Sequence, residues 1–276
     1  MTVPIGLELF VREDIRDTVR ERQFQLLVGI YVLLALLMTS AAGRASATDP
    51  ELVSPLVTLF AMVTPLLALG FFASAIVEKR TSGALTVVLG LPIDRSTVVV
   101  GTFLGRSIVI CTAVVTAVLA AVPVALGFDI AIDPVRLVGV ASLLALLGVT
   151  FTAIAVAISA IVRSATRATA TAFGAFVLFF FDLWAHLPRT VLYVTHGFSI
   201  PETTPEWVTF VSALNPVAAY TNLFSGLFPG FNSGTFISPP SEAAIYQEPS
   251  FAFVILVGWI VFAIGLGVWR FQTTDI

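Results

Sequence analysis

Charge is scarce in this chain of 276 residues. Asp, Glu, Lys and Arg together make up 11% of it, against about 25% in an ordinary soluble domain. Apolar residues make up 58%. This composition excludes a soluble globular fold, because so few charges cannot cover a surface exposed to water. Cys111 is the single cysteine, so the chain makes no internal disulfide and its redox compartment stays undetermined.

Motifs for catalysis and nucleotide binding are also missing. The sequence contains no HExxH, GxSxG or P-loop pattern, and its two histidines are His186 and His196. A P-loop would supply the backbone amides and the lysine that hold ATP phosphates, so this chain does not bind ATP in that way. We therefore expect no catalytic residue, no resident metal and no cofactor on this chain. We also expect no removable signal peptide, since no short apolar core with a cleavage site lies near the start.

Long apolar stretches are what the chain does contain. A helix rises about 1.5 Å per residue, so about 20 apolar residues cross a hydrocarbon core of about 30 Å. Six stretches meet this length, at approximately 24–42, 55–77, 97–127, 135–162, 167–187 and 251–271. The sequence therefore predicts an all-α polytopic membrane protein, with 1–276 forming a single transmembrane domain. Pro65 and Pro123 lie inside two of the stretches and predict kinks or breaks there.

Basic residues lie mostly on one side of the six stretches. With an even number of spans, segments 1–23, 78–96, 163–166 and 272–276 share the side of the termini. Eleven basic residues belong to these segments or the adjoining span ends, namely Arg12, Arg16, Arg20, Arg22, Lys79, Arg80, Arg95, Arg106, Arg163, Arg167 and Arg270. The other side has Arg44, Arg136 and Arg189. This bias predicts that both termini are cytoplasmic and that the chain lies in the cell membrane.

Arginine far outnumbers lysine, since Lys79 is the only lysine. The outer loops are acidic. Both features fit a salt-loving prokaryote, in which high salt screens the repulsion between carboxylates. A GC-rich genome also favours Arg over Lys, and the two interpretations stay open.

Two segments outside the spans have helical patterns. Residues 5–22 carry an apolar face with charges opposite it, which predicts an interfacial amphipathic helix, or alternatively a solvated one. The outer segment 188–250 is unusually long for a connection. Its aromatic first half predicts two short helices, on either side of Pro216, that dip into the outer membrane interface. Its second half, 229–250, is rich in Pro and Gly and predicts a loop.

Asp182, His186 and Arg189 form a candidate outer polar cluster. Their spacing of four and seven residues places them on one face of a continuous helix. An acid within a span is a candidate functional residue. The alternative is a cluster whose members satisfy one another near the interface. Asp182 and the two histidines also offer metal-ligating atoms, although no spacing requires a metal.

The inner loop 78–96 has the most informative pattern. It begins with Glu78-Lys79-Arg80, turns at Gly83, continues as a short apolar helix and stops at Pro92. The loop resembles the signature of the second class of ABC-transporter permeases. The resemblance extends over most of the chain, including the N-terminal helix, the six spans, the long outer segment and Leu214-Asn215-Pro216. Among compact permeases, the chain resembles those encoded with nitrous-oxide-reductase maturation proteins.

This resemblance implies a mechanism. In that family two permease subunits pair, and each carries a separate cytoplasmic ATPase that holds ATP and Mg. The loop between spans two and three is the coupling helix, and the bundle alternates between two states in the lipid bilayer. The resemblance favours an exporter and implies no nucleic-acid partner. The implied coupling residues are Glu78, Arg80, Gly83, Leu85 and Leu89.

Other classes of function stay open at this stage. An ion-coupled secondary transporter would favour broken helices, midplane charges and inverted repeats. A channel or scaffold would need no ATPase. An intramembrane enzyme would need converging polar residues deep in several spans, and these are nearly absent. The sequence does not identify the substrate, which ranges from lipid-like drugs and peptides to copper- or sulfur-related species.

Overall fold

The computed structural model describes residues 22–45, 52–83, 94–199, 203–228 and 245–273. The described residues are helical apart from their connections, which confirms the predicted all-α class. The predicted interfacial helix at 5–22 lies outside the described residues except for Arg22. Leu85 and Leu89 also lie outside them.

The chain divides into two compact units, residues 1–173 with 260–276, and residues 174–259. The prediction of a single domain over 1–276 stays a prediction.

Most helices of the first unit are long. They are α2 (Arg22–Arg44), α3 (Val53–Phe72), α4 (Ala75–Thr81), α6 (Arg95–Gly127) and α7 (Pro134–Ile161). Two further helices have residues in both units, namely α8 (Ala165–Phe180) and α12 (Pro249–Gln272). The second unit adds α9 (Leu183–Thr195), α10 (Glu206–Ala213), α11 (Pro216–Leu227) and a 3₁₀ turn at Ile245–Gln247. In the described residues five helices are long and apolar enough to span a membrane, or six if the bent pair α8 and α9 counts as one span.

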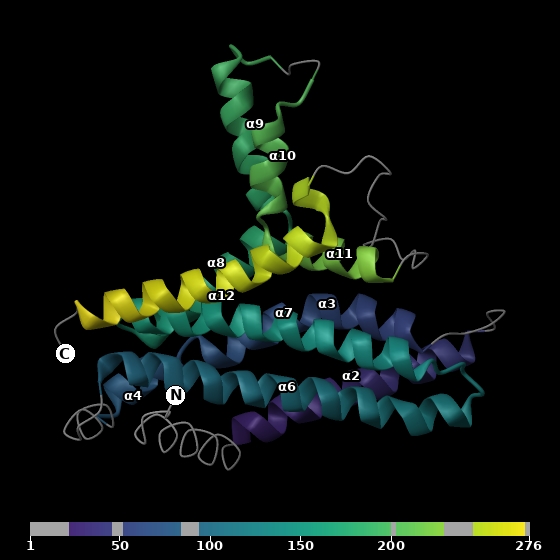
Figure 1. The fold of residues 1–276 in the computed structure, drawn as a ribbon. Helices are drawn as coiled ribbons and strands as arrows, with labels where there is room; N and C mark the ends of the chain where they lie inside the picture. The colour runs from purple at the N-terminus through teal and green to yellow at the C-terminus, as the bar shows by residue number, and fades with distance from the viewer. Residues whose placement is uncertain (1–21, 46–51, 84–93, 200–202, 229–244, 274–276) are drawn as a thin grey trace. The chain divides into compact units, whose positions relative to one another are not determined.

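Helix α7 is the most buried of the long helices. In the first unit α3 and α6 pack on α7, and α2 packs on α6 (Figure 1). Small residues allow these close approaches. A Cβ on Gly267 of α12 would lie 3.2 Å from Ala157 Cα, and a Cβ on Gly148 would lie 2.9 Å from the Ile110 side chain. Lipid provides no hydrophobic force between helices, so close packing over small residues holds the bundle together.

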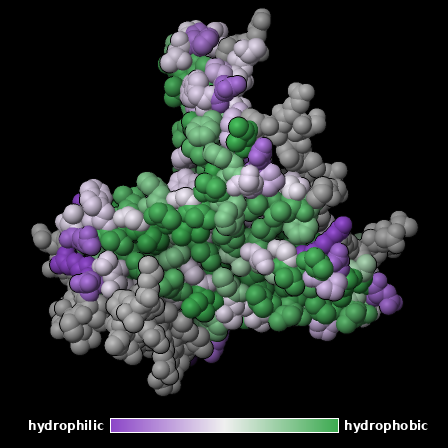
Figure 2. Space-filling model, viewed as in Figure 1, coloured by the Kyte–Doolittle hydropathy of each residue, from purple (hydrophilic) through white to green (hydrophobic). Residues whose placement is uncertain are grey.

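The outward faces of the bundle are apolar. Leu26, Leu33, Leu119 and Val138 are each more than half exposed. Figure 2 shows hydrophobic residues covering this face, with hydrophilic residues gathered towards the ends of the long helices. Such a surface fits a hydrocarbon environment and not water.

Local sequence signals explain where several helices begin and continue. Asp133 caps α7, its Oδ1 accepting from Val135 N at 2.9 Å and from Arg136 N at 3.2 Å, and Pro134 occupies the first helical position. Of the kinks or breaks predicted at Pro65 and Pro123, breaks are excluded, because each proline lies inside a helix that continues past it. A discontinuity occurs instead between α3 and α4, at Ala73 and Ser74.

The fifth apolar stretch, 167–187, is not the one continuous helix that the shared helix face of Asp182, His186 and Arg189 requires. Helix α8 ends at Phe180, α9 begins at Leu183, and the two are bent by 70°. Asp182 adopts a left-handed conformation with φ of 57°, which a continuing right-handed helix cannot contain. Helix α9 then continues to Thr195, into a segment for which the sequence predicted no helix. The two short helices expected around Pro216 are present as α10 and α11.

Candidate functional site

The first part of the candidate site is the entry to loop 78–96. Glu78 is exposed, and its Oε1 accepts a hydrogen bond from Ser74 Oγ at 2.6 Å. The chain turns at Gly83, whose φ of 76° lies in the left-handed region that glycine adopts without steric cost. Nothing lies within 4 Å of a Cβ built on Gly83, so the backbone conformation and not space requires glycine here.

Arg80 faces into the protein. Its Nη1 donates to Val162 O at the end of α7 at 3.2 Å, and its guanidinium lies 5.5 Å from the centre of the Phe271 ring on α12. Its Nε and Nη2 atoms are buried. Sequence reasoning expected Arg80 to contact another subunit, whereas in the structure it joins α4 to the ends of two other helices of its own chain.

Ser159 is a residue that sequence reasoning missed. Its buried Oγ accepts from Ile76 N at 2.9 Å and from Val77 N at 3.2 Å, two amides in the first turn of α4. These amides have no carbonyl partner in the preceding turn because α3 has already ended. The only sequence signal is a hydroxyl within a run of alanines in the fourth span. Ser159 therefore fixes the start of α4 to α7.

The far end of loop 78–96 is also attached to α12. Arg95, the first residue of α6, donates from Nη1 to Gln272 O at 3.4 Å. Near both attachments lies a buried apolar cluster formed by Ile76, Val98, Val99, Val156, Ala160 and Phe271. Arg80 thus attaches the first flank of the loop to α7 and α12, and Arg95 attaches the second flank to α12.

Arg106 lies further inside its span than the sequence pattern predicts. The sequence pattern groups it with the bases on the side of the termini, but it lies 11 residues into α6, about 16 Å along the helix axis. Its side chain is only 7% exposed, and its guanidinium lies 5.8 Å from the centre of the Phe72 ring. A buried arginine in a span next to the α3–α4 discontinuity is a candidate for a functional residue.

The second part of the site is the helix break in the other unit, which is held by Asn215. This side chain is 1% exposed. Its Nδ2 donates to Phe179 O at the end of α8 at 2.9 Å and lies 3.5 Å from Asp182 Oδ1, while its Oδ1 accepts from Val217 N at 2.9 Å. Asn215 thus satisfies a carbonyl that the broken helix leaves without a partner and at the same time caps α11. The segment Leu214-Asn215-Pro216 thus links the end of α8 to the start of α11.

Two tryptophans complete this arrangement. Trp184 Nε1 donates to Val211 O and Trp259 Nε1 donates to Leu214 O, both at 2.7 Å. Their rings pack on each other and on Phe179, with ring centres 5.2 to 5.9 Å apart. One carbonyl in the last turn of α10 and that of its capping residue, Leu214, are therefore occupied, which fixes α10 next to the break.

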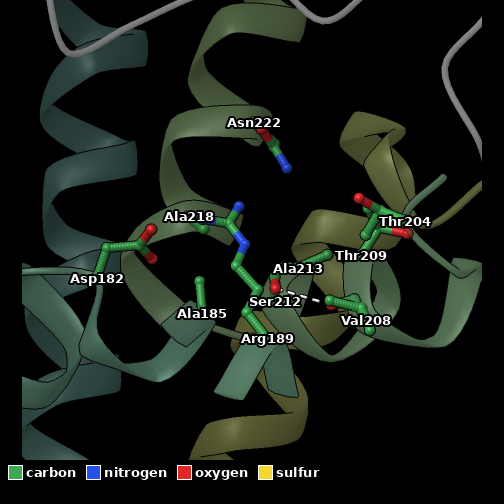
Figure 3. A pocket seen from close by; sticks show the side chains of 10 residues that line it. All are labelled: Asp182, Ala185, Arg189, Thr204, Val208, Thr209, Ser212, Ala213, Ala218 and Asn222. Carbon is green, nitrogen blue, oxygen red and sulfur yellow. Dashed lines mark hydrogen bonds between the residues drawn. The ribbon is translucent and has the colours of Figure 1, made fainter. Parts of the chain in front are cut away.

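The predicted cluster of Asp182, His186 and Arg189 is only partly assembled. Asp182 and Arg189 both line a cavity of about 350 Å³ formed by α9, α10, α11 and Thr204 (Figure 3). His186 does not line it, and its Nδ1 lies 2.9 Å from the backbone oxygen of Asp182. Within the described residues no three Asp, Glu, His or Cys side chains are grouped so as to hold a metal ion.

These features define a class of protein, a polytopic membrane protein in which the flanks of loop 78–96 are attached to other helices of the bundle. The model of the ABC-2 family transporter protein matches residues 10–276, and the chain belongs to this family. It is therefore a permease subunit of an ABC transporter and a multi-pass membrane protein, and the family implies a partner ATPase subunit.

Two curated relatives agree with this family. The probable ABC transporter permease protein NosY of Pseudomonas aeruginosa is 27% identical over 274 residues, covering 94% of this chain and 96% of that protein. The protein of the same name from Stutzerimonas stutzeri is 27% identical over 266 residues, covering 90% of this chain and 91% of that protein. Both support the predicted resemblance to the subgroup associated with nitrous-oxide-reductase maturation.

Proposed function

We propose that this chain is the non-enzymatic permease of an exporter in the cell membrane, driven by a cytoplasmic ATPase that docks on loop 78–96. The observation that supports the proposal is the attachment of the loop flanks, through Arg80 to α7 and α12 and through Arg95 to α12. A subunit pushing on the loop would move two membrane helices together. The permease acts as a homodimer, and ATP and Mg are held by the ATPase, since the sequence of this chain has no phosphate-binding loop.

The experiment is co-expression with the cognate ATPase. The purified permease alone is expected to hydrolyse no ATP, and the complex is expected to contain two copies of each subunit, as native mass spectrometry would measure. Robust hydrolysis by the permease alone would make this chain an enzyme and contradict the proposal.

The complex of permease and ATPase also tests the attachment of Arg80 to α7 and α12. Arg80→Met keeps the aliphatic stem and removes the guanidinium, whose hydrogen bond contributes about 1.5–3 kcal/mol. We expect the ATPase still to co-purify, while the permease-dependent part of its hydrolysis rate falls about tenfold, the factor that corresponds to about 1.4 kcal/mol. The control Arg167→Met, an exposed arginine in the first turns of α8, should behave like the unmodified protein. Loss of ATPase binding in Arg80→Met would show that Arg80 contacts the partner directly.

Topology is part of the proposal. Ten basic residues, once Arg106 within α6 is left out, against three favour cytoplasmic termini and an external second unit. The test introduces Ser82→Cys or Thr203→Cys, one at a time, into a Cys111→Ala background, and both positions are exposed. An impermeant thiol reagent added to intact cells should label position 203 and leave position 82 unlabelled. The reverse pattern would invert the orientation.

A further inference from the structure

The cavity beside the helix break carries two opposite charges that do not pair with each other. Asp182 lies at the start of α9 and Arg189 lies seven residues further on, and both line the cavity. Among the described residues no ion pair within 4 Å involves either side chain, and both are exposed. Figure 3 shows the Arg189 side chain reaching across the cavity towards Ala218 and Asn222, with Asp182 on the other side of it.

The remaining polar groups of the cavity differ in what they offer to a ligand. The hydroxyls of Ser212 and Thr209 donate to Val208 O and Glu206 O of their own helix, at 2.7 and 2.8 Å. The Thr209 oxygen already has a second partner, because it lies 3.0 Å from the Tyr246 hydroxyl, whereas the Ser212 oxygen remains as an acceptor. Asn222 makes no hydrogen bond within the described residues and offers an amide donor beside Arg189. The cavity thus offers donors at Arg189 and Asn222, and the anionic acceptor of Asp182 at a separate place in its lining.

We propose that this cavity binds a small zwitterion of dipeptide size, with its carboxylate on Arg189 and Asn222 and its ammonium group on Asp182. A simple anion would be repelled by Asp182 and a simple cation by Arg189, so only a ligand with both charges gains from both residues. A volume of about 350 Å³ is at the small end of the range of ligand pockets, about 300–1,000 Å³.

The spacing of the two charges favours a dipeptide over a free amino acid. Seven residues of helix separate the Cα atoms of Asp182 and Arg189 by about 10 Å along the axis. An extended dipeptide separates its ammonium and carboxylate groups by about 6 Å, and a hydrogen bond at each end adds about 3 Å. The sum, about 12 Å, is within reach of the flexible arginine. The two charges of a free amino acid lie closer together, so Arg189 would have to move towards Asp182 for both residues to be met.

The test is isothermal titration calorimetry, in which alanyl-alanine is titrated into the full-length protein in lipid nanodiscs. Two derivatives serve as probes, N-acetyl-alanyl-alanine, which lacks the cation, and alanyl-alanine amide, which lacks the carboxylate. We expect saturable binding of alanyl-alanine below about 10 mM and at least about tenfold weaker binding of each derivative. This inference does not depend on the ATPase, so its failure and that of the proposed transport function are distinguishable.

Three variants locate the site. Asp182→Asn keeps the oxygen that lies near Asn215 and tolerates a positive φ, while Arg189→Gln removes the cation. Each should weaken alanyl-alanine binding at least about tenfold, whereas Arg163→Gln in the other unit should leave it unchanged. Absent binding of alanyl-alanine, equal binding of the acetylated derivative, or unchanged binding by both cavity variants would each overturn the proposal. The two derivatives test the unmodified protein, so the proposal stays testable even if a variant fails to fold.

Discussion

Replacing Leu85 and Leu89 together with aspartate is expected to lower the affinity of the permease for its ATPase tenfold or more. Both leucines lie on the apolar part of loop 78–96 and outside the described residues. Burying one leucine in a partner groove contributes about 1.5–3 kcal/mol, and about 1.4 kcal/mol already corresponds to tenfold in affinity. Co-purification of a tagged ATPase with the variant measures the loss. No predicted span is altered, so the variant should still insert into the membrane.

Two matched changes make this result specific. Leu85→Met with Leu89→Met keeps both positions apolar and should bind the ATPase normally. Gly83→Pro forces φ to about −65° where the structure has 76°, so it should disturb the loop without changing its apolar residues. We expect this variant to bind weakly or to hydrolyse ATP without coupling. Normal binding and coupling in both Gly83→Pro and the double aspartate variant would exclude the loop as the coupling element.

Asn215→Ala is expected to destabilise the second unit more than any other single truncation of a polar side chain there. The change removes the donor to Phe179 O and the acceptor for Val217 N. Each buried group left without a partner costs about 1–3 kcal/mol. The total cost, about 2–6 kcal/mol, is comparable to much of the stability of a small unit. Hydrogen exchange at the amides of α11 and around residues 179–185 measures the effect.

Asn222→Ala is the matched control because it removes the same group from the same helix. Asn222 is half-buried and makes no hydrogen bond within the described residues, so its truncation should leave hydrogen exchange close to that of the unmodified protein. If the two variants exchange equally, Asn215 does not hold the break, and the bend between α8 and α9 must have another cause.

Much of the molecule was predictable because its determinants are local. The apolar stretches identify the membrane helices, since each must satisfy its own backbone within the hydrocarbon core. The caps are also local. Asp133-Pro134 and Asn215-Pro216 each place a side-chain acceptor directly before a proline, and each begins a helix as observed. The turn at Gly83 belongs with them, since glycine adopts its φ without steric cost.

The departures from the sequence-based predictions come from contacts between distant residues. Nothing in Phe179-Phe180-Phe181 forbids a continuous helix, and the break is stable because Asn215, 36 residues from Phe179, takes the carbonyl that the break frees. Arg80 follows a charged residue, which is a pattern typical of a solvated side chain. Its position is decided instead by Val162, 82 residues away, and by Phe271.

The sequence by itself determined the membrane class, the helices and the family, because hydrophobic length and short motifs depend on neighbouring residues alone. Only the tertiary structure decided which polar groups face inward, where the fifth stretch bends and which charges share a cavity. The physical reason is that in an apolar environment a polar group must find a partner, and that partner is often supplied by a distant part of the chain.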